Sequence, residues 1–238
     1  MNCKSCNEAV ADKFCGHCGT AAVLKRVDGH YILHEVQHVL HFEKGILYTI
    51  KELLIRPGKN IRGFLTEDRS RLVKPVIFLV ISSLVYTLIT HFFHIEKDHW
   101  ISDPENYKTF AAITEWIEGH YGYSNIIMGL FIGGWLKIFI RKSGYNFFEI
   151  LIMLCFVLGT GMLIYAMLAL VQGITGKNMK LVSELASMLY SMWAIGQVLG
   201  GKKIKGYVLS LVAYILGMGS FWMAAGLLAS IIDSFFKH

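Results

Sequence analysis

The chain has 238 residues, a net charge of +6 and a hydrophobic fraction of 54%, with a mean hydropathy of +0.48 and a pI near 9.0. This composition is too apolar for a soluble globular domain, so we expect an all-α, multi-span membrane bundle. The positive charge does not require a nucleic-acid partner, because the basic residues stand beside apolar blocks, where anionic lipid headgroups are nearer. We therefore expect membrane lipids as partners and no nucleic acid.

Two Cys-x-x-Cys pairs open the chain, Cys3 with Cys6 and Cys15 with Cys18. Thiolates at this spacing can bind a single metal ion, and four of them complete a closed tetrahedral shell with no open position for a substrate. Residues 1–24 are therefore predicted to be a zinc ribbon with one structural Zn²⁺ ion. Thiolates that bind zinc also indicate a reducing compartment.

Residues 25–74 are predicted to form a basic, amphipathic juxtamembrane region. Between Lys44 and Pro75, eight basic residues stand against three acidic ones, and apolar residues recur at helical spacing until Arg56-Pro57-Gly58 breaks the helix. A helix of this kind rests on the membrane surface rather than crossing it. The side chains expected to bind lipid headgroups or a protein partner are Lys51, Arg56, Lys59, Arg62, Arg69, Arg71 and Lys74.

Two groups of histidines have spacings that would suit a metal site or a pH sensor. One group lies along a single face of a predicted helix, and the other lies near the end of the first apolar block. A polar surface without a ligand explains both groups more simply, and metal binding remains the alternative. The residues concerned are His30, His34, His38 and His41 in the first group, and His91, His94 and His99 in the second.

Residues 75–238 are predicted to hold five transmembrane helices, each near the roughly 20 residues that cross a bilayer. The second is short, and a re-entrant segment is the alternative for it. After the first, an apolar stripe predicts a short helix on the outer leaflet. The five spans are Pro75–Phe93, Asn125–Ile140, Ile150–Gln172, Leu181–Leu199 and Tyr207–Ile232, and the stripe is Phe110, Ile113, Trp116 and Ile117.

The distribution of basic residues predicts the orientation of these spans. In the five-span arrangement, eighteen of the 23 Lys and Arg residues fall on the side of the N-terminus. Cytoplasmic loops carry the excess of positive charge, so the N-terminus is predicted to be cytoplasmic and the C-terminus outside. The zinc-binding thiolates indicate the same side independently.

The middle of each predicted span lacks Asp, Glu, Lys, Arg and His. Coupled transporters and intramembrane proteases usually need such groups at membrane depth, and no catalytic motif is present, so we do not expect an enzyme. The predicted function is recruitment of a cytoplasmic protein, or sensing of membrane state, by the zinc ribbon and the basic helix. The alternative is a channel, transporter or scramblase for an uncharged solute or lipid. Glycines at four-residue spacing favour close helix packing, within one bundle or in a homo-oligomer.

The first 80 residues contain a set of motifs: the paired Cys-x-x-Cys head with Phe14–Gly19, then Lys44–Thr49, Leu53–Gly58, Arg69–Arg71 and Lys74-Pro75 before an apolar block. Together these motifs resemble a bacterial membrane family, domain of unknown function 3667. The resemblance implies a cytoplasmic zinc ribbon on a bacterial inner-membrane protein, and it brings no activity or catalytic residues. The segment Gly63–Asp68 is more acidic than the family pattern. A weaker likeness to Yip-type five-span membrane proteins rests on architecture alone.

Overall fold

The structure is a computed structural model of the chain. It describes residues 2, 3, 6, 8, 9, 16, 17, 45–95, 108–141, 144–200 and 204–236. The chain divides into two compact units, Met1–His41 and Phe42–His238, and the helices described below belong to the second. Outside the helices, the described residues contain one isolated antiparallel bridge, between Asn2 and Ala9.

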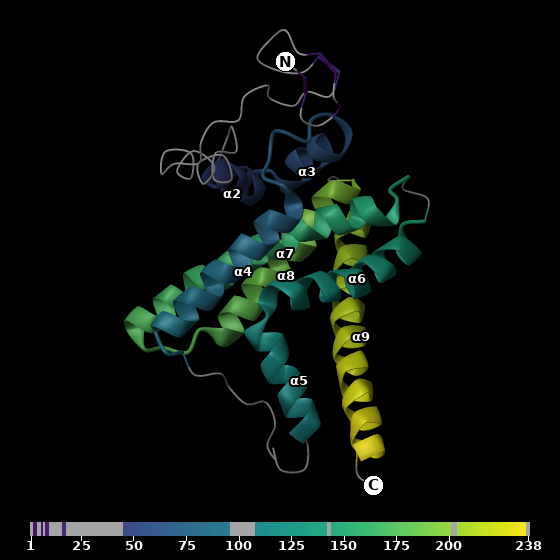
Figure 1. The fold of residues 1–238 in the computed structure, drawn as a ribbon. Helices are drawn as coiled ribbons and strands as arrows, with labels where there is room; N and C mark the ends of the chain where they lie inside the picture. Colours follow the sequence, from purple (N-terminus) through teal and green to yellow (C-terminus); the bar gives the residue numbers. More distant parts are fainter. Residues whose placement is uncertain are drawn as a thin grey trace. The chain divides into compact units, whose positions relative to one another are not determined.

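Eight helices account for the regular structure of the described part of the second unit (Figure 1). They are α2 (Gly45–Ile55), α3 (Pro57–Thr66), α4 (Pro75–Phe92), α5 (Lys108–Gly119), α6 (Tyr121–Phe139), α7 (Phe147–Thr175), α8 (Lys180–Leu199) and α9 (Ile204–Phe236). The all-helical prediction is confirmed for these residues.

Local sequence signals explain where several helices begin and end. Pro57 and Pro75 occupy the first turns of α3 and α4, where a missing N–H costs nothing. At the start of α7 the Asn146 side chain accepts a hydrogen bond from the Glu149 N–H at 2.8 Å, and the Glu149 carboxylate accepts one from the Asn146 N–H at 2.8 Å. Gly176, with a φ of 69°, ends the same helix in the left-handed conformation.

One apolar core joins α2, α3, α4, α6, α7, α8 and α9. Its middle is α7, where Phe156 is fully buried and its ring lies 5.1 Å from Phe64 of α3 and 6.0 Å from Phe78 of α4, measured between centroids. In the most apolar 18-residue stretch of α7, 61% is buried inside the protein, against 22% in the corresponding stretches of α4 and of α9. We infer that α7 is the central helix, and that α4 and α9 turn apolar side chains toward lipid.

Three of the described helices are long and apolar enough to cross a membrane: Pro75–Phe92, Phe147–Thr175 and Ile204–Phe235. Helices also occupy the positions of the second and fourth predicted spans, as α6 and α8. These two are less apolar, because α6 contains Asn125 and Lys137, and α8 contains Glu184 and several serines. The structure thus supports a membrane protein, while the number of spans remains a prediction.

Helix α5 contains the predicted apolar stripe, and three of its four side chains pack against α9. Ile117 is buried against Phe221 and Ala225 of α9, with Phe110 and Ile113 beside them. These three side chains contact α9, and a position of α5 at the outer leaflet stays a prediction. Trp116 remains 48% exposed.

Candidate functional site

The four cysteines predicted to bind zinc are only partly described. Cys3 is buried and Cys6 is half-buried, and the Cys3 N–H donates to the Glu8 carbonyl at 2.8 Å, which folds this segment back on itself. Cys15 and Cys18 lie outside the described residues, as do His30, His34, His38, His41 and His99. Among the described side chains, no group of three or more His, Cys, Asp or Glu residues could hold a metal ion. The zinc site stays a prediction.

His91 and His94 are described, and both are exposed at the end of α4. Their rings stack with centroids 6.4 Å apart. This places the pair at a helix terminus, where their polar edges can reach water. Metal binding here also stays an untested alternative.

Helices α2 and α3 form a cap over one end of the bundle in the second unit, and hydrogen bonds fix its shape. The Asn60 amide donates to the Glu52 and Arg56 carbonyls at 3.1 and 2.9 Å and so bridges the break before Pro57. The Thr49 hydroxyl accepts from the Val73 N–H at 3.1 Å. These bonds tie the first helix of the cap to the second and to the segment that enters α4.

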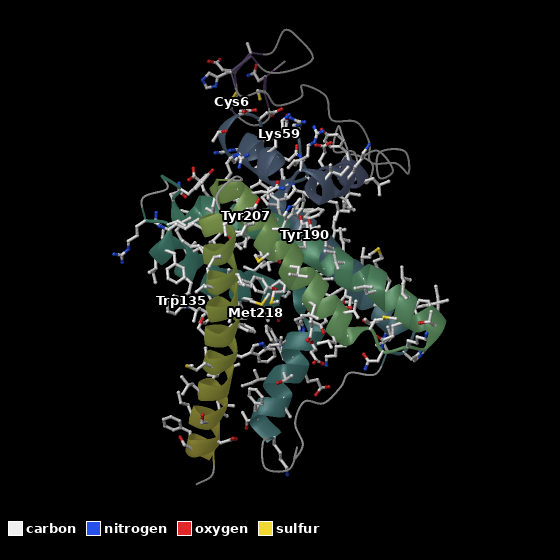
Figure 2. The ribbon with its side chains drawn as sticks, turned by 180° about the vertical axis from the view of Figure 1, so that it is seen from behind. Cys6, Lys59, Trp135, Tyr190, Tyr207 and Met218 are labelled. Atoms are coloured by element: carbon white, nitrogen blue, oxygen red, sulfur yellow. The ribbon has the colours of Figure 1, made fainter. Side chains whose placement is uncertain are left out.

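Two further hydrogen bonds join the cap to α8. The Tyr190 hydroxyl donates to the Leu53 carbonyl at 3.1 Å (Figure 2). The Gly58 N–H donates to the Gln197 side-chain oxygen at 3.3 Å. A Cβ atom at position 58 would lie 2.6 Å from the Cβ of Gln197, so glycine allows α3 to approach α8 this closely.

Two of the seven predicted headgroup-binding residues have internal partners. The Arg62 guanidinium donates to the carbonyls of Gln197 and Val198 in the last turn of α8, the second at 3.2 Å. A cation there satisfies carbonyls that the helix leaves unpaired. The Arg71 guanidinium donates to the Tyr48 hydroxyl at 3.2 Å, and this hydrogen bond raises the pKa of Arg71 above its ordinary value. We assign both arginines to the structure of the cap.

The other five predicted residues are exposed, and we call them the basic surface: Lys51, Arg56, Lys59, Arg69 and Lys74. Exposed apolar side chains stand beside them on α2, namely Leu47, Leu54 and Ile55 at 78%, 46% and 55%. Two nearby carboxylates have local partners, since Glu52 accepts from the Asn60 amide and Asp68 accepts from Ser70. Exposed cations next to exposed apolar side chains suit the boundary between headgroups and acyl chains.

A second candidate site is a large cavity of about 1390 Å³ among α4 to α9. Its walls come from the end of α4, from α5, from the starts of α6 and α8, from the second half of α7 and from the middle of α9. Tyr86, Tyr121 and Tyr165 meet on its wall, and Tyr86 lies 5.0 Å from Tyr121 and 5.8 Å from Tyr165 between ring centroids. Glu118 and Glu184 also line the cavity.

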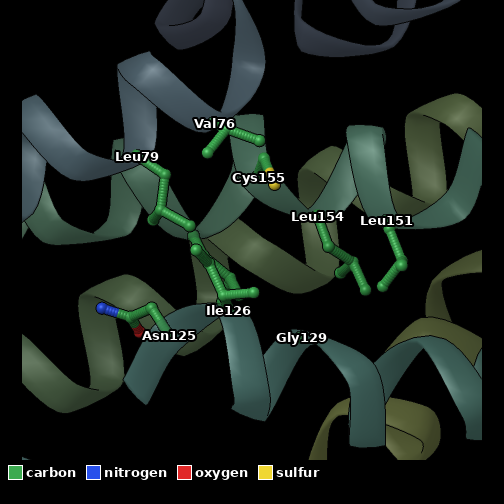
Figure 3. A pocket seen from close by; sticks show the side chains of 9 residues that line it. Val76, Leu79, Asn125, Ile126, Gly129, Leu151, Leu154 and Cys155 are labelled. Carbon is green, nitrogen blue, oxygen red and sulfur yellow. The ribbon is translucent and has the colours of Figure 1, made fainter. Parts of the chain in front are cut away.

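Sequence reasoning did not find this cavity. Its polar residues come from helices that are far apart in the chain, and only the fold brings those helices together. A signal that the sequence does contain is the acidic residue Glu184, three residues after the start of the predicted span Leu181–Leu199. A smaller pocket of about 130 Å³ lies nearby between α4, α6 and α7 and is almost entirely apolar (Figure 3).

Over the residues that the structure describes, the fold and these sites define a helical bundle with three helices able to cross a membrane and a basic cap at one end. The model of a family described as "Protein of unknown function (DUF3667)" matches residues 43–87. This segment is the cap together with most of α4, and the resemblance predicted from the sequence is confirmed over it. Neither a curated protein nor a solved structure matches the chain.

Proposed function

We propose that the chain is a non-enzymatic protein of the bacterial inner membrane with five spans, whose basic surface binds anionic lipid headgroups at the cytoplasmic face. In this proposal residues 1–24 form a zinc ribbon on the same side of the membrane and recruit a cytoplasmic protein. The cap holds the basic surface in a fixed position, so lipid binding can report the state of the membrane to that partner.

The observation that carries the proposal is the exposure of five cations on the cap and on the segment that joins it to α4: Lys51, Arg56, Lys59, Arg69 and Lys74. Arg62 and Arg71 also have partners within the protein, so we base the proposal on the five exposed cations. Each basic residue close to an anionic leaflet contributes about 1 kcal/mol. Five of them give a preference for anionic lipid that salt would weaken.

The placement of other charges supports the proposed orientation. Lys137 and Arg141 stand where α6 ends, and Lys205 stands where α9 begins. If the five long helices alternate in direction, these residues share the end of the bundle that carries the cap. The opposite end has Glu118 and Glu184, so the excess of basic residues marks the cap side as cytoplasmic.

Five spans also need α6 and α8 to cross the bilayer. With 19 and 20 residues, each is about 30 Å long, which matches the hydrocarbon thickness. Lys137 lies in the last turn of α6 and donates to the Tyr145 carbonyl at 2.6 Å. Its charge therefore stays close to the headgroups and away from the middle of the span.

Transport or scrambling of an uncharged solute or lipid is a second candidate function, and the large cavity favours it. The cavity is lined from one half of the bundle, because residues 132–157 and 190–213 do not contribute to it. The apolar core occupies that other half. A transporter would have to open this core during its cycle.

The lipid-binding proposal predicts a loss of lipid preference when basic surface residues are neutralised. Lys51→Gln with Lys59→Gln should lower the association constant of spin-labelled phosphatidylglycerol relative to phosphatidylcholine. Removal of two surface cations at about 1 kcal/mol each gives a fall on the order of 30-fold. Electron paramagnetic resonance of the full chain in mixed bilayers measures this ratio.

Lys108→Gln with Lys177→Gln is the matched control, since both of these lysines are exposed at the other end of the bundle. The control should keep the preference of the unsubstituted chain. An equal loss in the two double variants would show that net charge alone sets the preference. That result, or no loss in either variant, would refute the proposed role of the basic surface.

A further inference from the structure

The large cavity contains an acidic side chain that has little to neutralise it. Glu184 lies one turn into α8, is half-buried and lines the cavity. Among the described residues, no hydrogen bond or salt bridge reaches its carboxylate. Partial burial of a carboxylate costs free energy unless something compensates its charge. A bound cation would supply that compensation.

The wall around Glu184 is rich in aromatic rings. Tyr86, Tyr121 and Tyr165 form an edge-to-face cluster drawn from three helices, and Trp222 of α9 lines the cavity and is 38% exposed. The faces of such rings attract cations, most strongly where water is limited. Aromatic faces next to a carboxylate favour an organic ammonium group over a hydrated metal ion.

The charged side chains around the cavity also favour a cation. The carboxylates of Glu118 and Glu184 line it, together with one permanently charged base, Lys180, and the imidazoles of His91 and His94 near the end of α4. Three helices, α4, α5 and α7, end at the cavity, while α6 and α8 begin there. Helix C-termini carry partial negative charge, so the backbone does not reverse the preference for a cation.

An independent observation points to a polar ligand. Asn125 of α6 is 7% exposed and lines the cavity, and its side-chain nitrogen has no hydrogen-bond partner in the described structure. Figure 3 shows the amide turned away from Leu151 and Leu154 of the small apolar pocket. A buried donor without a partner destabilises the protein. An oxygen acceptor on a ligand would remove that cost.

The inner part of the cavity is apolar and adaptable. Four methionines line it, and Met218 lies in the middle of α9 (Figure 2). Methionine side chains adjust to irregular apolar shapes. The four are Met128, Met162, Met188 and Met218. The volume of about 1390 Å³ exceeds that of a typical small-molecule site and leaves room for an acyl chain.

We propose that this cavity binds an amphipathic molecule with an ammonium group, an oxygen acceptor and an apolar body. Glu184 and the tyrosine cluster bind the ammonium group, the Asn125 amide donates to the oxygen, and the methionines surround the apolar body. A membrane lipid with an ethanolamine headgroup has this chemistry, and so does a free organic cation. The site is separate from the basic surface, so either proposal can fail without the other.

The first experiment measures binding of radiolabelled tetraphenylphosphonium to the full chain in nanodiscs. Tetraphenylborate has the same shape and the opposite charge, and it should bind at least roughly tenfold more weakly. Glu184→Gln should weaken phosphonium binding roughly tenfold or more. Glu115→Gln is the matched control, because Glu115 is exposed on α5 and does not line the cavity.

The second experiment identifies the source of the ammonium group. Native mass spectrometry of nanodiscs with equal ethanolamine and glycerol phospholipid should show ethanolamine lipid enriched on the unsubstituted chain. Asn125→Leu should reduce that enrichment and leave phosphonium binding unchanged, because phosphonium has no oxygen acceptor. Phosphonium binding without lipid enrichment would assign the site to free organic cations.

Two results would overturn the proposal. One is equal phosphonium binding by Glu184→Gln and Glu115→Gln, provided that both variants melt at the temperature of the unsubstituted chain. The other is borate binding as tight as phosphonium binding. If Glu184→Gln fails to fold, Tyr86→Phe with Tyr165→Phe should keep phosphonium binding, because the ring faces remain. Loss of binding in that variant would also count against the proposal.

Discussion

Replacement of Gly58 by leucine is expected to lower the melting temperature of the purified protein by roughly 6 to 12 °C. A Cβ atom at this position would lie 2.6 Å from the Cβ of Gln197 and 2.8 Å from its backbone carbonyl carbon and oxygen. Backbone cannot move aside as a flexible side chain can, so α3 must separate from α8. Overpacking of this kind costs about 3 kcal/mol, which in a chain of this size gives the stated shift.

Gly63→Ala is the matched control in the same helix. A Cβ atom at Gly63 would have its nearest neighbour, the Glu67 carboxylate, at an ordinary 3.6 Å. Alanine favours helix over glycine by about 1 kcal/mol, so this variant should melt at or slightly above the unsubstituted protein. Thermal unfolding followed by circular dichroism in detergent measures both. Equal losses at the two positions would contradict the close approach of α3 and α8.

Phe156→Ala is expected to cost about 3 to 5 kcal/mol of unfolding free energy, because it opens a cavity where three helices meet. The side chain is fully buried in α7, and its ring contacts Phe64 of the cap and Phe78 of α4. The loss should appear in chemical unfolding of the detergent-solubilised chain. The cap should separate first, since it depends on this contact.

Phe148→Ala, in the first turn of the same helix, should change the unfolding free energy by only about 0.5 kcal/mol, because Phe148 is 73% exposed. A comparable loss at both positions would mean that Phe156 is not at the centre of the core. It would also remove the reason for treating the cap and the bundle as one cooperative unit.

Helix positions could be predicted from the sequence because their signals are local. The predicted span Pro75–Phe93 corresponds to α4, which is Pro75–Phe92. The predicted span Leu181–Leu199 corresponds to α8, which is Lys180–Leu199. Proline at a first helical position and a long apolar run suffice for this. The distribution of apolar residues along the sequence could not show that α7 is central and that α4 and α9 are peripheral, because all three helices are apolar around their whole circumference.

The region after Arg56 could be predicted only in part from local sequence signals. The Pro57-Gly58 break was predicted, but the second helix of the cap was not. Ile61, Phe64 and Leu65 of α3 are buried against other helices, and only those tertiary contacts reveal their role. The same holds for Arg62, which looked like a surface cation until α8 placed two carbonyls beside it.

The most direct test of the proposed architecture is the side of the membrane on which residues 59 and 177 lie. Both are exposed lysines, and α4, α6 and α7 separate them in the chain. Lys177→Cys in intact spheroplasts should react with a membrane-impermeant maleimide, measured above the background of the unsubstituted chain. Lys59→Cys should react only after permeabilisation. Labelling of both positions from the same side would contradict the five-span proposal, because α6 would then not cross the membrane.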